Sequence, residues 1–141
     1  MYLLDTHVIS ELRKAAGADR RVAAWAGQAD SRHMHISVAS VLEIRLGILS
    51  VQRKDTARAD ILDTWLSRQV LPAFAERIIP IDLAVALRCA ELHVPNPRSD
   101  RDALIAATAL VHRLTVVTRN TKDFLPTGVT TLNPWEFREH I

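Results

Sequence analysis

The residues at the start of the chain constrain its fold more than any other stretch. A short apolar run, Tyr2-Leu3-Leu4, stops abruptly at Asp5, and a hydroxyl residue, Thr6, follows it. Beyond Thr6 the pattern becomes helical, so this stretch predicts a buried strand that ends at Asp5 and turns into a helix. In open α/β sheets, ligands bind in the crevice outside the carboxyl ends of the strands. Asp5 is therefore placed either for chemistry or, more simply, as the N-cap of the following helix.

Strand-like and helix-like segments alternate along the rest of the chain. We expect strands at residues 34–37, 77–82, 114–118 and 129–132, and helices at residues 19–29, 38–51, 55–74, 83–93 and 99–113. Residues 94–98 and 119–128 are expected to be loops, and Pro72 to end or bend its helix. The helix of residues 38–51 is apolar almost all round and is expected to be buried. This alternation predicts an α/β fold with a parallel, doubly wound sheet, in one domain spanning residues 1–141.

The cations of the chain are overwhelmingly arginine. Of 18 Lys and Arg residues, only Lys14, Lys54 and Lys122 are lysine. Arginine presents a planar fork that suits phosphate oxygens, and a formal net charge of +2 permits binding to nucleic acid without requiring it. The one cysteine, Cys89, excludes a disulfide within the chain and is expected to be a small core residue.

The sequence carries no pattern for membrane insertion or export. Its longest apolar runs are far shorter than a bilayer span, and its N-terminus lacks a basic segment followed by a long apolar one. We therefore expect a cytoplasmic protein that does not bind membranes.

Glu43 lies on a stripe of small or polar residues along an otherwise apolar helix. Ser40, Glu43, Gly47 and Ser50 are spaced so that they share one helical face. Two interpretations stay open. The stripe is either a narrow solvent-facing seam or the wall of a cleft, in which small neighbours leave room beside Glu43 for a substrate.

Asp102 belongs to the segment Ser99-Asp100-Arg101-Asp102, which precedes a run of small apolar residues. Ser99 followed three residues later by an acid is the pattern of a capping box, and acids in a first helical turn are stabilising. The same placement can aim Asp102 at the crevice of the sheet, because the alanines beyond it allow the helix to pack closely. Asp100 is the competing acid, and one of the two is expected to be merely a first-turn residue.

Asn120 and Asp123 follow the apolar strand of residues 114–118, so they also fall at the carboxyl edge of the sheet. The alternative interpretation is an Asx-turn or the cap of a short helical turn.

Together these segments bring acids from four places in the sequence to one edge of a parallel sheet. Clustered carboxylates repel and raise one another's pKa values unless a cation lies among them. A set of oxygen ligands suits Mg²⁺ or Mn²⁺ and argues against zinc. The chain has no Gly-rich phosphate loop, no P-loop lysine and no Ser-His-Asp signature. We therefore predict metal-assisted hydrolysis of a phosphodiester.

The motifs of the chain also resemble those of a known family. The likeness rests on residues 3–11, residues 37–47, residues 102–109, Thr118-Arg119-Asn120 and residues 132–135, and it spans essentially the whole chain. The sequence resembles PIN-domain proteins, specifically the VapC/FitB-type toxins of bacterial toxin–antitoxin pairs.

This resemblance implies a three-layer α/β/α fold with a short, mostly parallel central sheet. It implies an endoribonuclease that depends on Mg²⁺, with Mn²⁺ as the other candidate cofactor. It further implies RNA as the substrate, a cognate antitoxin that reaches into the active-site groove, a homodimer, and contact with operator DNA only through the antitoxin. The competing hypothesis is a non-catalytic RNA-binding or antitoxin-complexed regulator of transcription on the same fold.

By position, Asp5 and Asp102 match the principal metal ligands of the family, and Glu43 matches its second acid. In some members an aspartate directly follows the threonine-arginine pair, where this chain has Asn120. Other members place an acid at the position of Asp123. Either Asp123 supplies the fourth carboxylate, or the site works with three acids and the Asn120 amide.

Residues beside the acids complete the prediction. Thr6, Ser37 and Thr118 match hydroxyl residues that orient the carboxylates. The cations that flank the acid-bearing segments are candidates for RNA phosphate contacts: Arg13, Arg45, Arg98, Arg101, Arg119 and Lys122. The helical segment of residues 62–74, which includes Trp65, is a candidate dimer surface, with ordinary core packing as the alternative.

Overall fold

The computed structural model describes residues 1–139, and its centre is a parallel sheet. The strands are β1 (Tyr2–Leu4), β2 (Met34–Ser37), β3 (Ile78–Ile79), β4 (Thr115–Val117) and β5 (Thr131–Leu132). They follow the spatial order β3-β2-β1-β4-β5, and all four pairings are parallel. The predicted parallel sheet is confirmed, although β3 and β5 are shorter than the sequence pattern indicated.

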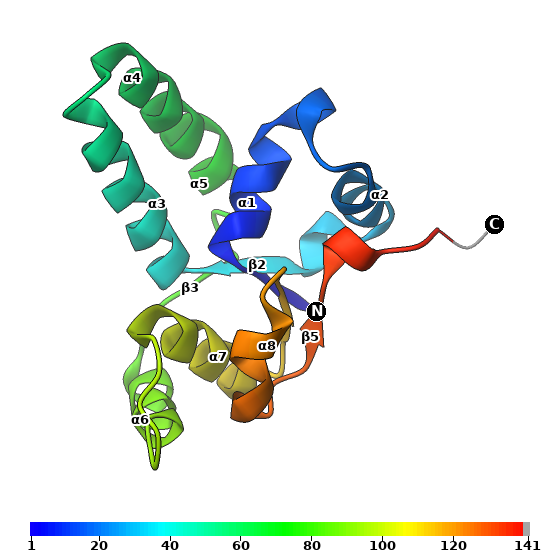
Figure 1. Cartoon of the computed structure of the whole chain (residues 1–141), viewed down its shortest axis with the longest axis vertical. Helices are drawn as coiled ribbons and strands as arrows, with labels where there is room; N and C mark the ends of the chain where they lie inside the picture. The colour runs from blue at the N-terminus through cyan, green and yellow to red at the C-terminus, as the bar shows by residue number, and fades with distance from the viewer. Residues whose placement is uncertain (140–141) are drawn as a thin grey trace.

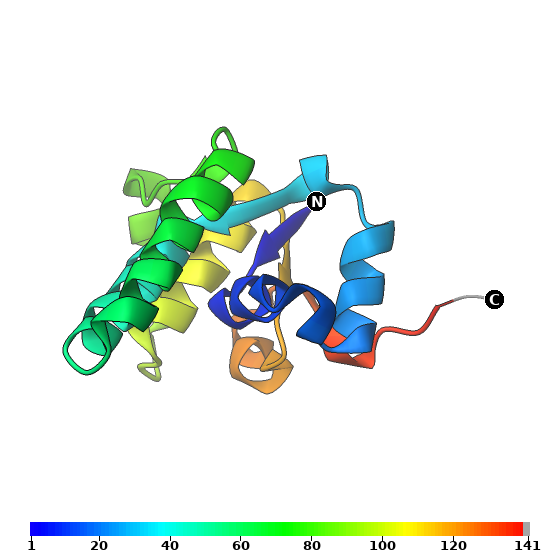
Figure 2. The ribbon, with the colours of Figure 1, turned by 90° about the horizontal axis from the view of Figure 1, so that it is seen from above.

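Helices cover both faces of this sheet, which gives the three layers of the predicted fold. One layer contains α1 (Thr6–Arg13), α2 (Arg20–Gln28), α3 (Val38–Gln52), α4 (Thr56–Trp65) and α5 (Leu71–Ala73). The other layer contains α6 (Leu83–Leu92), α7 (Asp100–His112) and α8 (Thr121–Phe124). Figure 1 shows α1 to α5 above the strands and α6 to α8 below them. From above, α3 and α4 lie side by side at one end of the sheet and α2 lies at the other (Figure 2).

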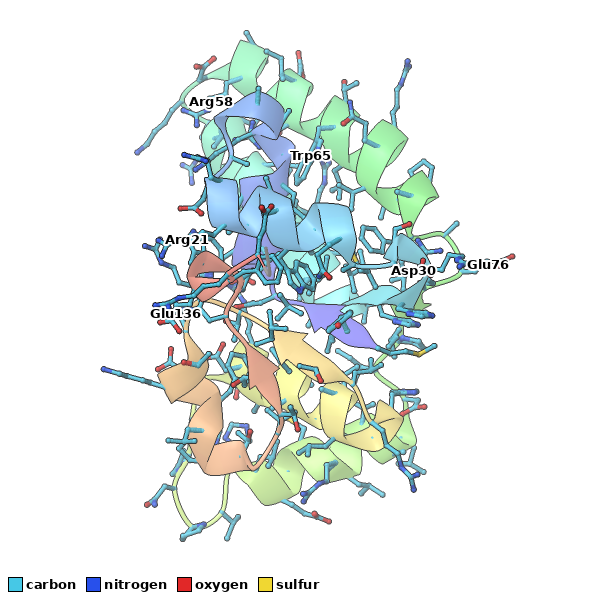
Figure 3. The ribbon with its side chains drawn as sticks, turned by 90° about the vertical axis from the view of Figure 1, so that its right-hand side faces the viewer. Arg21, Asp30, Arg58, Trp65, Glu76 and Glu136 are labelled. Carbon is cyan, nitrogen blue, oxygen red and sulfur yellow. The ribbon has the colours of Figure 1, made fainter. Side chains whose placement is uncertain are left out.

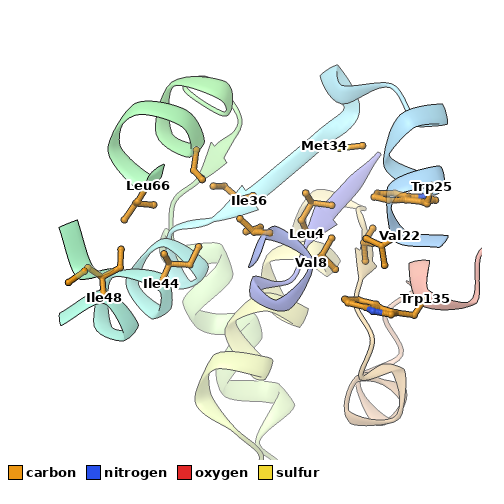
Figure 4. Packing of buried hydrophobic residues seen from close by; sticks show 14 residues of the cluster. Leu4, Val8, Val22, Trp25, Met34, Ile36, Ile44, Ile48, Leu66 and Trp135 are labelled. Carbon is orange, nitrogen blue, oxygen red and sulfur yellow. The ribbon is translucent and has the colours of Figure 1, made fainter. Parts of the chain in front are cut away.

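Alternation along the strands divides the core into two clusters. Leu3 and Val116 pack among the residues of α6, α7 and α8, whereas their neighbours Leu4 and Val117 pack among those of α1 to α4. This is the two-residue period of a strand that is buried on both faces. Figure 4 shows the second cluster, in which residues from α1, α2 and α3 surround Leu4.

The strand order reverses beside β1, and this reversal places the site. From β1 the chain moves outward to β2 and β3, and it then returns to lay β4 on the opposite side of β1. The boundary between β1 and β4 is therefore the topological switch point, the place where open α/β sheets bind ligands. Asp5 and Thr118 are the first residues beyond the carboxyl ends of these two strands.

The prediction that α3 is buried was wrong. Leu42, Leu46 and Leu49 are 55%, 43% and 41% exposed, although Ile44 and Ile48 on the other side are buried. Apolar residues lie on several sides of this helix, but the described elements of the chain cover only the side of Ile44 and Ile48. Burial depends on which neighbours reach a helix, and composition alone does not reveal this.

Pro72 lies one residue before the end of its helix, as predicted, and the hydrogen-bond pattern of the helix changes in the turn before it. Between α4 and α5 the helix widens into a π-turn, Leu66–Val70, in which the Leu71 N–H donates to the Leu66 carbonyl. A proline lacks an N–H and clashes with the carbonyl four residues back, and a π-turn is a common way to accommodate a break in the hydrogen-bond ladder. Helical structure then ends at Ala73, one residue beyond Pro72.

Residues 119–128, expected to be a loop, contain α8 and a 3₁₀ turn at Leu125–Thr127. The buried side chain of Phe124 anchors this segment in the core, which a pattern dominated by polar residues did not indicate. A further 3₁₀ turn, η5 (Pro134–Glu136), packs against α2. Figure 3 looks onto α2, with Arg21 labelled on it and Glu136 labelled on the turn.

Within residues 1–139, none of the helices has the length and hydropathy needed to cross a membrane.

Candidate active site

Asp5 is held at the switch point by three hydrogen bonds, one to the following residue and two to the end of β4. Its carboxylate accepts the Thr6 N–H at 2.7 Å and the Thr118 hydroxyl at 2.8 Å, and its own N–H donates to the Val117 carbonyl at 2.9 Å. The side chain is buried, with 6% of the residue exposed. Burial raises the pKa of Asp5 above its usual value, against the lowering effect of the bonds from Thr118 and Thr6. Asp5 thus caps α1 and also presents a carboxylate that resists ionisation.

Glu43 reaches the same edge from α3. Its Oε2 accepts a hydrogen bond from the Thr6 hydroxyl, so the residue after Asp5 fixes the second acid. Its Oε1 forms an ion pair with Arg101 Nη1 at 3.2 Å, which links α3 to the first turn of α7. Sequence reasoning did not find this pair, because the only signal was an arginine directly before the candidate Asp102.

Asp102 lies in the first turn of α7, half-buried and close to the other acids. Burial is the largest cause that raises the pKa of Asp102, and the negative charges of Asp5, Asp123 and Glu43 raise it further. The structure therefore brings the four predicted acids into one electrostatic neighbourhood. Ser99 precedes α7 but its side chain makes no capping bond, so the expected capping box does not form.

Asn120 and Asp123 face different surroundings. The Asn120 N–H donates to the Thr118 hydroxyl at 3.0 Å, and Asn120 lines a cleft with His7 and Arg119. Asp123 lies in α8, is exposed, and contributes to the raised pKa of Asp102. The negative charge of Asp123 therefore acts on Asp102, whereas the neutral Asn120 amide can offer only hydrogen bonds or a ligand oxygen.

The small residues of α3 and its N-cap, Ser37, have different surroundings. Ser37 caps the helix by accepting the Ala39 N–H at 3.0 Å, and within residues 1–139 it makes no hydrogen bond to a carboxylate. Ser40 is fully buried, and its Oγ has no hydrogen-bond partner in the described part of the chain. Gly47 is exposed, and a Cβ there would meet no atom within 4 Å. The stripe therefore runs from the interior at Ser40 to solvent at Gly47, with Glu43 between them.

His7 is a neighbour of the acids that the sequence did not single out. Its Nδ1 lies 3.9 Å from Asp5 Oδ2, and its side chain is largely exposed. His7 lies two residues after Asp5, in the first turn of α1, and this spacing was the only signal for it in the sequence.

The side chains fit a hydrated divalent cation better than a fully enclosed one. Within residues 1–139, no three His, Cys, Asp or Glu side chains stand close enough to form a complete metal site. Mg²⁺ usually keeps several waters and takes only one or two protein carboxylates. Burial, and after it the charges of neighbouring acids, raise the pKa values of Asp5 and Asp102, and a nearby positive charge would favour their ionised forms. The donor set therefore suits a magnesium ion with most of its hydration shell.

Comparison with known proteins agrees with this geometry. The family model described as PIN domain matches residues 2–126, a range that includes all four acids. The chain belongs to the PIN-domain family. This PIN domain is similar to VapC ribonuclease Y4jK of Sinorhizobium fredii, at 38% identity over 141 residues, covering 96% of this chain and 99% of the relative.

Two further likenesses cover nearly the whole PIN domain. It is 36% identical over 140 residues to toxin FitB of Neisseria gonorrhoeae, covering 96% of this chain and 99% of the relative. It is also similar to a solved structure of FitAB bound to an IR36 DNA fragment, with a TM-score of 0.86, 34% identity and 100% of both chains covered. The resemblance drawn from the sequence motifs is thereby confirmed.

Thr118 offers a test of how the PIN domain holds Asp5. Thr118→Val leaves a buried carboxylate oxygen and the Asn120 N–H without their partner, so we expect a loss of about 1–3 kcal/mol in the free energy of unfolding. Since the lost bond lowers the pKa of Asp5, that pKa should rise further, and any activity that needs the ionised form should shift to higher pH. Urea unfolding and a pH–rate profile measure both effects. Thr118→Ser retains the hydroxyl and is the control; equal profiles for the two variants would contradict this role.

Proposed function

We propose that this PIN domain is the toxin of a type II toxin–antitoxin system and acts as a Mg²⁺-dependent endoribonuclease. The observation that carries the proposal is the gathering of Asp5, Glu43, Asp102 and Asp123 at the β1–β4 switch point. Such a cluster costs stability at neutral pH, since burial and the charges of neighbouring acids raise the pKa values of Asp5 and Asp102. The ribonuclease name of one full-length relative and the toxin name of another support the same function.

In this proposal Asp5 and Asp102 hold the divalent cation, Mg²⁺ or Mn²⁺, directly or through water. When bound, such a cation lowers the pKa of a coordinated water and polarises a phosphoryl oxygen. The Thr118 hydroxyl and the Thr6 backbone N–H orient the Asp5 carboxylate. These bonds keep the carboxylate aimed without a costly rearrangement on binding.

Glu43 is proposed to position the attacking water for in-line displacement, which would leave 5′-phosphate and 3′-hydroxyl ends. Its carboxylate is fixed by Thr6 at one oxygen and by Arg101 at the other. Each oxygen retains a free lone pair that can accept a proton or hydrogen bond from water. Arg101, already paired with Glu43, is also placed to neutralise charge on the phosphate.

The fourth position distinguishes Asp123 from Asn120. We propose that Asp123 is the fourth acid, because it is a carboxylate whose charge reaches Asp102, whereas Asn120 is a neutral amide that lines the neighbouring cleft. Asp123→Asn is then expected to lower the cleavage rate about tenfold or more, and Asn120→Ala to change it less. Single-turnover cleavage measures both. A larger loss in Asn120→Ala would assign the fourth position to the amide instead.

We further propose an antitoxin as the protein partner, a homodimer as the assembly, and operator DNA as a contact made only through the antitoxin. The support is the similarity to FitB and to a FitAB structure that holds DNA. The partly buried Trp65, which lines an apolar groove with Leu12 and Phe74, remains a candidate for either protein contact.

The test of the proposed function is RNA cleavage by the purified chain. With Mg²⁺, total cellular RNA should be cut at discrete positions, and EDTA should stop the reaction until Mg²⁺ is restored. A chain that binds RNA but leaves it intact under all of these conditions would instead be the non-catalytic regulator.

A further inference from the structure

The cleft that Asn120 lines with His7 and Arg119 lies beside the acids, and most of its charged residues are basic. It has a volume of about 370 Å³ and is lined by residues of α1, by the segment after β4 and by η5. Three cations, Arg13, Lys14 and Arg119, and one acid, Glu11, line it together with His7, Ser10, Asn120 and Trp135. The residues that line this cleft are far apart in the sequence, and the stability of the fold does not require the cationic side chains among them to lie together.

The Arg119 guanidinium lies over the Trp135 indole, 5.2 Å from the ring centroid. Trp135 is 7% exposed and belongs to the core, so it is a fixed platform for a side chain that is itself exposed. Stacking on an aromatic face restrains a guanidinium while leaving the N–H groups at its edge free. A restrained arginine with free donors is suited to bidentate binding of a phosphate.

The cations of the cleft are only partly neutralised. Lys14 pairs with Glu11 at 3.0 Å, whereas Arg13 and Arg119 have no carboxylate partner within ion-pair distance in residues 1–139. Arg13 lies over the Trp65 ring at 5.8 Å, so it too is restrained by stacking. Arg13 and Arg119 are both exposed, so each can offer its guanidinium N–H groups to an anion in the cleft.

One hydroxyl joins this cleft to the acidic site. The Thr118 hydroxyl donates to Asp5 and accepts the Asn120 N–H. Arg119 therefore lies between two residues whose positions are tied to Asp5 by hydrogen bonds. His7 lines the cleft as well and lies 3.9 Å from Asp5. A polyanion that places one phosphate at the acids would thus pass a neighbouring phosphate across Arg119.

We propose that this cleft binds the RNA backbone next to the scissile phosphate, with Arg119 as the phosphate contact and Trp135 as the residue that positions it. The proposal deepens the proposed function and rests on it for the identity of the polyanion as RNA. It assigns Trp135 a role through Arg119 and no contact with the reacting atoms.

Binding is measured apart from cleavage by placing every variant in an Asp5→Asn background and using fluorescence anisotropy with a short single-stranded RNA. Arg119→Gln is expected to weaken binding about tenfold at 0.1 M salt and to reduce the salt dependence by about one phosphate contact. Arg119→Lys, which keeps the charge but not the planar fork, should restore only part of the loss. The matched control is Arg88→Gln on α6, in the opposite helical layer, which should bind like the parent.

Trp135 is tested by a double-mutant cycle. Trp135→Leu should weaken RNA binding when Arg119 is present and have no effect once Arg119 is glutamine, whereas Trp135→Phe should retain binding. Circular dichroism and thermal melts check that each variant folds. In cleavage by the chain with Asp5 intact, Arg119→Gln should raise KM about tenfold and change kcat little.

Several outcomes decide the matter. Arg119→Gln binding RNA as tightly as Arg88→Gln would overturn the proposal, even if the chain is an active nuclease. Unchanged RNA binding with weakened antitoxin binding would also overturn it and assign the cleft to the protein partner. If the wild type cleaves no RNA yet binds it through Arg119, the cleft proposal stands and the proposed hydrolysis fails.

Discussion

Replacing Asp5 by asparagine should abolish RNA cleavage and, in metal-free buffer, make the protein more heat-stable. The carboxylate is buried beside Glu43, and its pKa is raised mainly by burial. At neutral pH the fold must ionise this group at a cost that asparagine does not incur. The same substitution removes a proposed ligand of the cation, so we expect the cleavage rate to fall by ~10³-fold or more. Loss of activity with gain of stability is the signature of a site residue rather than a structural one.

Asparagine suits this position geometrically. Its amide oxygen can accept the Thr6 N–H, and its amide nitrogen can donate to the Thr118 hydroxyl, which has a free lone pair. Relief of the ionisation cost should raise Tm by about 2–4 °C per kcal/mol recovered. Asp60→Asn, an exposed acid on α4, is the control and should change neither property. An Asp5→Asn protein that cleaves RNA at a rate near that of the wild type would contradict the assignment.

Mg²⁺ should stabilise the wild type, and this effect should grow with pH. A ligand present at about 100 times its Kd and bound only to the folded state adds about 2.7 kcal/mol, or roughly 5–10 °C in Tm for a chain of this size. Asp5 and Asp102 have pKa values raised above 3.8 in the fold. Their protonated forms favour the folded state at low pH, and this stability is lost as pH rises from about the unfolded value through the raised pKa.

The cation requires the ionised carboxylates, so its stabilising effect appears over the same pH window and is greatest above it. Thermal melts with and without Mg²⁺ between pH 3 and 8 measure the effect. The difference between the Mg²⁺-induced Tm shifts of the wild type and of Asp5→Asn separates the effect of Asp5 from that of other titrating acids. One of these is Asp30, whose pKa is lowered to about 2 by Arg32. A Mg²⁺ response that is equal in both proteins, or that is largest at low pH, would exclude these carboxylates as the binding site.

The candidate acids could be selected from the sequence because they lie at the ends of elements. Asp5, Asn120 and Asp123 follow strands whose apolar runs stop abruptly, and parallel strands bring such ends to one edge. Asp102 belongs to the helix that leads into β4, so its first turn lies at the carboxyl end of that strand. These relations depend only on chain direction in a parallel sheet, and the alternation of strands and helices along the sequence predicts such a sheet.

Other features depend on which surfaces meet, and no local pattern contains that information. The exposure of Leu42 on α3 follows from the lack of a neighbour on that side within the described residues. The ion pair between Glu43 and Arg101 joins residues 58 positions apart through the packing of α3 on α7. Arg119 acquires its platform only because η5 brings Trp135 beside it. In each case the partner is set by tertiary contact, although the residue type was visible in advance.

The most direct test of the central claim is Mn²⁺ binding followed by electron paramagnetic resonance, in which bound Mn²⁺ loses the signal of the free ion. The wild type should bind Mn²⁺ in competition with Mg²⁺, and Asp5→Asn and Asp102→Asn should each weaken binding at least tenfold while Asp60→Asn should not. Wild-type protein that binds Mn²⁺ no more tightly than the Asp5→Asn, Asp102→Asn double variant would contradict the claim that these acids converge to hold a divalent cation.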